Sequence, residues 1–316
     1  MDNTPKQHSI LPGIGRAWSE LCSTLWKQTR QPGIVWLLCM ALLYNGLAWG
    51  LGPTDEQMRQ GYSLLGQAHS AAQPEQRERL LAAAIESFKE AYQQSGSRGK
   101  VQALLGAAQS YLLQQQSPRR FPFLWQPTPV QRAERSLIQA LVLHPNDGAA
   151  ALLLGIVYHR LAALAATPAS HLGQQRDKYF RLAAAQGLPL RQSPAAGCSG
   201  LSQAFDTNDA VLALQYMDAR GTGQADDLLF VYRSTEPGAR LFAVVVANGH
   251  CFPLITDAST GSLASAATLT GVSVQSQSSG RPLLNVLLSQ DHMPLEESFL
   301  WENTGFMYLG QHPLGQ

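Results

Sequence analysis

The sequence has almost no excess of charge of either sign. Its 316 residues carry 23 basic and 22 acidic side chains, which gives a net charge of +1. No run of Lys and Arg is longer than the pair Arg119 and Arg120. Proteins that hold a phosphate backbone concentrate positive charge on one face. The composition therefore predicts that nucleic acid is not a partner.

Signatures of catalysis are also scarce. The eight histidines form no His-Glu-x-x-His pair, the four cysteines form no Cys-x-x-Cys pair, and no Gly-x-Ser-x-Gly turn or phosphate-binding loop is present. The neighbours His250 and Cys251, and the pair Asp291 and His292, are lone residues of types that are more often structural. The sequence predicts neither an enzymatic activity nor a cofactor.

Charge is absent altogether from one stretch of twenty residues, 33–52, which has the sequence GIVWLLCMALLYNGLAWGLG. At about 1.5 Å per residue, a helix of this length spans the hydrocarbon layer of a bilayer. Trp36 and Trp49 lie near its ends, where amphipathic rings favour the headgroup level. The run predicts an uncleaved transmembrane helix. A cleaved signal peptide is the alternative, although the preceding segment is long and no small-residue cleavage site follows.

Basic residues are concentrated before this run. Lys6, Arg16, Lys27 and Arg30 precede it, whereas Arg59 is the only Lys or Arg in the twenty residues that follow. Because positively charged flanks stay on the cytoplasmic side, residues 1–32 are expected to be cytoplasmic and the chain after residue 52 to lie on the far side. In a bacterial inner membrane, that side is the periplasm.

The predicted cytoplasmic segment has an apolar stripe at helical spacing. The stripe falls at i, i+4, i+7 and i+11 and consists of Ile14, Trp18, Leu21 and Leu25. An amphipathic helix at the membrane surface has this pattern, and so does a helix that packs on a partner's transmembrane segment. The sequence does not separate the two.

Residues 53–189 have helical periodicity, with alanine at the close contacts. The clearest junction, AERSLIQALVLHP followed by ALLLGIVY, orders small and large side chains as Ala133, Leu137, Ala140, Pro145, Ala151, Leu154, Gly155 and Tyr158. AIESFKEAY and LLGAAQSYL repeat the register, and the last helix, RDKYFRLAAAQGLP, fits it poorly. The pattern resembles the tetratricopeptide repeat. This resemblance implies three stacked helix pairs whose concave face binds peptides or other subunits; a generic array of helical hairpins is the alternative.

Residues 190–316 begin with a linker rich in Pro, Gly and Ser and continue with short β-rich runs separated by turn residues. The runs are AVLALQYM, DLLFVYR, RLFAVVVA, FPLITD, GVSVQSQ, LLNVLLS and the closing hairpin SFLWENTGFMYLG. They predict an antiparallel β-domain, either a sandwich or a propeller-like sheet. The predicted fold is a multidomain α+β membrane protein with a cytoplasmic segment 1–32, a transmembrane helix 33–52, a tetratricopeptide-like solenoid 53–189 and a β-rich domain 190–316.

One turn of the β-domain, MDARGTGQADDLLFVY, resembles the aspartate-rich calcium loops of FG-GAP and VCBS repeats, with Asp218 and Asp226 as the candidate ligands. Calcium takes six or more oxygen ligands, but Arg220 and Thr222 stand where two carboxylates are expected. We interpret the turn as a loop that keeps its shape without a metal, with Arg220 bridging Asp218 and Asp226. A glycine-rich hairpin with solvated aspartates is the alternative.

Cys198 and Cys251 are the only cysteines beyond the hydrophobic run. In an oxidising compartment they form a disulfide if their Cα atoms come within about 7 Å of one another. Otherwise they remain free thiols.

The stretch SPRRFPFLWQPTP interrupts the helices with four prolines, which cannot continue a helix. A projecting loop with several apolar side chains is therefore expected. Three fates are open to it: packing on its own domain, contact with the outer leaflet, or contact with a partner. For the last, the candidate partner-binding residues are Arg119, Arg120, Phe121, Phe123 and Trp125.

These features together favour a membrane-anchored periplasmic scaffold or assembly subunit of a larger inner-membrane complex. Its expected partners are other subunits of the complex and the lipid bilayer. The alternative is a free-standing periplasmic module that binds a ligand such as cell-wall glycan. A binding function is implied by the repeat resemblance and by the lack of catalytic motifs.

Overall fold

The computed structural model describes most of the chain after residue 52: residues 53–114, 127–165, 170–191, 198, 201–235, 240–256, 262–263, 267–276, 281–290 and 293–313. The chain divides into two compact units, Met1–Pro53 and Thr54–Gln316, and the description concerns the second. The predicted cytoplasmic segment and transmembrane helix lie outside the described residues, with Ile14, Trp18, Leu21, Leu25, Trp36 and Trp49. None of the described helices is both long and apolar enough to cross a bilayer.

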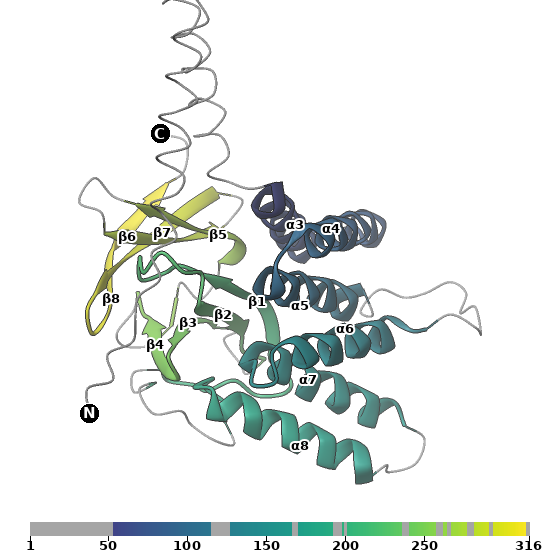
Figure 1. Ribbon diagram of the computed structural model, residues 1–316. Coiled ribbons are helices and arrows are strands. Elements are labelled where there is room, and N and C mark those ends of the chain that lie inside the picture. The colour runs from purple at the N-terminus through teal and green to yellow at the C-terminus, as the bar shows by residue number, and fades with distance from the viewer. Residues whose placement is uncertain are drawn as a thin grey trace, which may run out of the picture. The chain divides into compact units, whose positions relative to one another are not determined.

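The described residues form six helices in the first part of this unit (Figure 1): α3 (Pro53–Ser70), α4 (Pro74–Gln94), α5 (Ser97–Gln114), α6 (Pro129–Leu143), α7 (Gly148–Leu164) and α8 (Ser170–Ala185). Their ends follow from local chemistry. Proline starts α4 and α6, where the missing N–H leaves no helical bond unmade. Thr128 and Gln131 form a capping box at α6, and Asp147 caps α7 by accepting the N–H of Ala150.

The helices pack where an aromatic ring meets a glycine. Phe88 of α4 lies against Gly61 of α3 and Gly106 of α5, where an added Cβ atom would come within 2.7 and 2.3 Å of the ring. Gly155 of α7 meets Phe180 of α8 in the same way, at 2.4 Å. Close packing of this kind tolerates no extra methyl group. The last helix therefore pairs large with small side chains as the others do, although its sequence fits the repeat pattern poorly.

In the described part of the chain, eight strands form the second part: β1 (Ala210–Met217), β2 (Asp227–Arg233), β3 (Leu241–Ala247), β4 (His250–Leu254), β5 (Thr268–Ser276), β6 (Pro282–Gln290), β7 (Met293–Glu302) and β8 (Gly305–Pro313). They form two four-stranded sheets, β1-β2-β3-β4 and β5-β6-β7-β8, and within each sheet consecutive strands pair antiparallel. The prediction of antiparallel β-structure after the helices is confirmed. AVLALQYM and DLLFVYR match β1 and β2 residue for residue.

The first sheet is buried on both faces. Phe230, Tyr232 and Val244 share a core with α5 and α7, which lie beside this sheet in Figure 1. Leu229 and Val231 point the other way and share a second core with the β5–β8 sheet. Two-sided burial explains why β2 and β3 are continuous apolar runs instead of alternating ones. The helices and both sheets thus form three layers within one compact unit.

The two sheets share the second core, and their edges also meet on one side. β4 lies against β8, and the ring of Phe252 on β4 meets the ring of Trp301 on β7 edge-on, with 5.1 Å between their centroids. The opposite edges are β1 and β5, which belong to different sheets and do not pair with one another. The space between these two edges is where a groove opens.

Candidate binding groove

The loop predicted to contact a partner cannot be placed. Arg119, Arg120, Phe121, Phe123 and Trp125 all lie outside the described residues, which end at 114 and resume at 127. Their role in binding stays a prediction.

The turn between β1 and β2 holds its first aspartate through bonds within the turn. One carboxylate oxygen of Asp218 accepts the N–H of Thr222 at 2.7 Å, and the other accepts the N–H of Gly223 at 2.8 Å. Gly221 and Gly223 have positive φ angles, a conformation that glycine adopts without strain. Among the described residues, no group of three or more His, Cys, Asp or Glu side chains is arranged to hold a metal ion.

Arg220 binds Asp227 more closely than either of the two aspartates, Asp218 and Asp226, that it was expected to bridge. Its Nε donates to Oδ1 of Asp227 at 2.7 Å, and its backbone N–H donates to Oδ2 at 2.9 Å. Asp226 is farther away, 3.8 Å from Nη2, and Asp218 is not part of this ion pair. The reason is burial. Asp227 begins β2 and is inaccessible to solvent, and a buried carboxylate without a cation beside it is strongly destabilising. Burial raises the pKa of Asp227, and Arg220 opposes that rise.

A disulfide joins Cys198 to Cys251, with 5.1 Å between the Cα atoms. Cys251 is buried on β4, in the core shared by the helices and the first sheet. Cys198 belongs to the connection between α8 and β1, which is also held by a single bridge between Leu190 and Phe205. The segment that composition identifies as a linker is thus fastened to the sheet.

The inner helices are covered by the chain's own first sheet. α5 is buried along most of its length, and so is the first half of α7. Side chains of α5 bind the edge of β1: Gln102 donates to the carbonyl oxygen of Tyr216 at 3.0 Å, and Gln109 donates to that of Leu214 at 2.8 Å. The concave surface that the repeat resemblance assigns to peptides or subunits is therefore occupied along these two helices.

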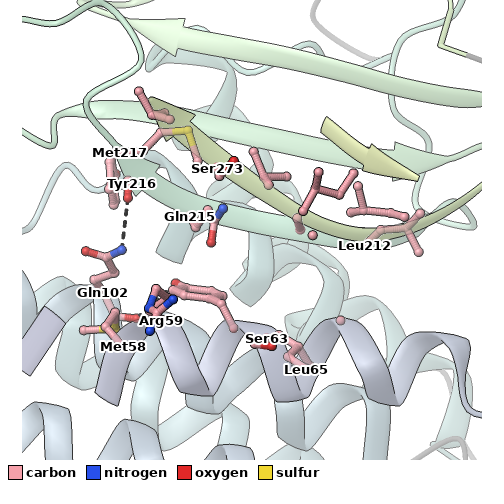
Figure 2. A pocket seen from close by; sticks show the side chains of 18 of the residues that line it. Met58, Arg59, Ser63, Leu65, Gln102, Leu212, Gln215, Tyr216, Met217 and Ser273 are labelled. Carbon is pink, nitrogen blue, oxygen red and sulfur yellow. Dashed lines mark hydrogen bonds between the residues drawn. The ribbon is translucent and has the colours of Figure 1, made fainter. Parts of the chain in front are cut away.

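A groove of about 610 Å³ lies between α3, the edge strand β1 and the edge strand β5. Figure 2 shows α3 running beneath the two strands, with Arg59 and Gln215 between them. Much of the wall is apolar: Met58, Tyr62, Leu65, Met217, Val272 and Val274. The helix and β5 approach each other closely at Gly66, whose Cβ, if present, would be 2.9 Å from the carbonyl oxygen of Thr270. The volume is in the range of ordinary ligand sites.

This groove carries little charge. Among the described residues, Arg59 is its only Lys or Arg, and no carboxylate lines it. Arg59 forms an exposed ion pair with Glu56 at 2.7 Å. Burial, assisted by Arg77 and Arg233, lowers the pKa of His69 to about 4, so this imidazole is neutral at pH 7. An uncharged occupant matches such a lining.

One end of the groove is fixed by a polar network around Tyr216. Its hydroxyl donates to Oδ2 of Asp147 at 2.8 Å, while Oδ1 of Asp147 accepts the N–H of Ala150. The hydroxyl of Tyr62 donates to the carbonyl oxygen of Gln102 at 3.4 Å. Burial raises the pKa of Tyr216 and that of Asp147. The network ties β1 to α7, so this wall is rigid before any ligand arrives.

The sequence did not reveal the groove, because its lining comes from several segments that are far apart in the chain, from Met58 on α3 to Leu287 on β6. One signal was nevertheless present. The run that became β5, TLTGVSVQS, has no charged residue and no proline, and an edge strand without either is open to further pairing.

Comparisons with protein-family models, curated proteins and solved structures find no match to this chain. The resemblances to tetratricopeptide repeats and to FG-GAP or VCBS loops therefore rest on sequence patterns. What the structure shows is an α+β chain in which six described helices and two antiparallel four-stranded sheets are packed in layers.

Proposed function

We propose that this chain is a membrane-anchored scaffold or assembly subunit of a bacterial inner-membrane complex, and that the groove between α3, β1 and β5 holds a partner. The groove is the observation that carries the proposal. It combines an apolar wall, a rigid end and little charge, which suit binding better than acid–base chemistry. In this proposal the tetratricopeptide-like hairpins support the sheet, and their covered face is not the peptide site.

Two further observations support the location. α3 begins directly after the predicted transmembrane run, and Met58 of the groove is six residues beyond its end. In this proposal the groove is therefore separated from the predicted membrane anchor by only a few residues of chain. The disulfide between Cys198 and Cys251 is typical of an oxidising compartment such as the periplasm.

The test is copurification with a groove-filling variant. Ser63 is exposed on α3 and lines the groove, whereas Gln67, one turn farther along, is exposed outside the lining. We expect the full chain and its Gln67→Trp variant to copurify with membrane proteins in stoichiometric amounts after gentle detergent extraction. Ser63→Trp should lose those proteins without a fall in melting temperature.

Two results would count against this role. One is recovery of the unaltered chain alone, and the other is retention of the same partners by both Ser63→Trp and Gln67→Trp. Sedimentation of the chain with purified cell wall would favour the glycan-binding alternative instead.

A further inference from the structure

Each sheet has two edge strands, β1 and β4 in the first and β5 and β8 in the second. Edge strands present backbone N–H and C=O groups that pair with other chains unless something protects them. β1 is met by Gln102 and Gln109 of α5. β4 has five residues, including Pro253, and it lies against β8. Three of the four edges are therefore protected.

β5 is protected at one end only. A bulge between Leu269 and Gly271 interrupts its pairing with β6, and Gly66 of α3 approaches the backbone at the same point. From residue 271 to residue 276 the pairing with β6 is regular, and GVSVQS contains no charge and no proline. Within the described part of the chain, no strand pairs with the other side of this stretch. At about 3.3 Å per residue, the free edge is about 20 Å long.

This free edge is also a wall of the groove, to which it contributes Val272, Ser273 and Val274. On the basis of the partner-binding role proposed above, we propose that an extended, uncharged segment of a partner protein pairs with residues 271–276 as an added strand. Its main chain bonds β5, and alternate side chains enter the groove against Met58 and Met217. A charged side chain at this position would lose its hydration without gaining a counter-charge that is not already paired, which is unfavourable.

A second copy of this chain does not suit the same edge. α3 lies against β5 at Thr270, where it leaves no room for even a Cβ on Gly66. Two β5 strands paired antiparallel would each meet the other copy's α3 at this point. A single extended segment from a different protein avoids that collision.

Synthetic peptides test the pairing directly. The probe is a labelled peptide of alternating threonine and valine, with the nine-residue length of β5. Two further peptides carry N-methyl groups on every threonine or on every valine, which removes the N–H groups on one side of the strand. An added strand uses the N–H groups of only one of its two sides to pair with β5. A shift of register by one residue would present the other side, but it would also turn the valines away from the groove. We therefore expect one methylated peptide to bind the full chain like the parent peptide and the other to bind about tenfold more weakly or worse.

Two variants of the full chain locate the pairing. Ser273→Lys places a charge on the free edge of β5, as natural edge strands do to prevent pairing. Gln311→Lys places the same charge on an exposed residue of β8, at the other edge of the same sheet. We expect Ser273→Lys to weaken binding of the parent peptide by about tenfold or more and Gln311→Lys to leave it unchanged.

Equal binding of both methylated peptides, or no binding of any peptide at about 1 mM, would overturn strand addition. So would self-association of the chain that Ser273→Lys abolishes, because the edge would then be used by a second copy. Either result leaves the scaffold role standing if Ser63→Trp still loses the membrane partners. If only the scaffold role is wrong, the chain still distinguishes the two methylated peptides as expected, but no membrane protein copurifies with it.

Discussion

Arg220 fixes the turn between β1 and β2 through an ion pair that is largely shielded from water. Its side chain is 15% exposed and that of Asp227 is 0% exposed. Arg220→Ala leaves a buried carboxylate without its cation, so we expect the free energy of unfolding to fall by about 3 to 5 kcal/mol. Arg59→Ala, which breaks a pair with Glu56 at the surface, should change it by less than about 0.5 kcal/mol. Urea unfolding of the full chain in detergent measures both, and equal losses would contradict the ion-pair argument.

His69 makes stability depend on pH. Its pKa is about 4 in the folded chain, against 6.5 for an unperturbed histidine. Because the folded value is the lower one, the stabilisation from keeping His69 neutral is complete above pH 6.5 and is lost as the pH falls toward 4. Between these limits the parent should lose about 2 kcal/mol more than the His69→Gln variant. If the free energy of unfolding falls by the same amount with pH in both proteins, burial of His69 has no such effect.

For single residues, the sequence predicted the cysteine pair, which depends only on how many cysteines are available. It did not predict the ion pair of Arg220, which depends on how the side chains pack. Cys198 and Cys251 were identified as a pair because no other cysteine follows the hydrophobic run. The partner of Arg220 was not predictable in the same way. Asp226 and Asp227 are adjacent, and only the start of β2 decides which of them is buried.

Among the elements, α7 and α8 give the sharpest test of packing. Gly155→Ala would place a Cβ 2.4 Å from the Phe180 ring, and overpacking of this kind costs about 1 to 3 kcal/mol. Gly173→Ala is the matched control, because no atom lies within 4 Å of its added Cβ and alanine favours the helix. We expect the first variant to melt at a lower temperature than the parent and the second at the same temperature or higher. A stable Gly155→Ala variant would mean that the two helices pack more loosely than described.

The elements were largely predictable and their arrangement was not. β1 and β2 appear in the sequence as short apolar runs separated by a turn that contains Asp218, Gly221, Gly223 and Asp226. The choice between a sandwich and a propeller-like sheet stayed open because strand number does not say what each face contacts. The groove was not predictable at all, because the approach of α3 to β5 at Gly66 and Thr270 is a contact between distant parts of the chain.

For the whole molecule, the first prediction concerns topology. Basic residues precede the run 33–52 and are nearly absent just after it, which favours a cytoplasmic N-terminus. A reporter that is active only in the periplasm should work when fused after Gln316 and fail when fused before Met1. The reverse pattern would place the groove on the cytoplasmic side and exclude a periplasmic scaffold.

In the proposed role, the unit from Thr54 to Gln316 is a frame that supports the groove between α3, β1 and β5. Its helices cover one face of the first sheet, its second sheet covers the other, and the disulfide fastens the connection between helices and strands. Binding then depends on the groove and not on the covered inner face of the hairpins.

Photo-crosslinking in intact membranes tests this claim most directly. A photoreactive amino acid is placed at Ser63 or Ser273, which line the groove, or at the exposed control positions Gln67 and Gln311, which do not. The account predicts one discrete crosslinked product of the same mass from both groove positions and none of that mass from the controls. No product from the groove, or the same product from all four positions, would contradict it.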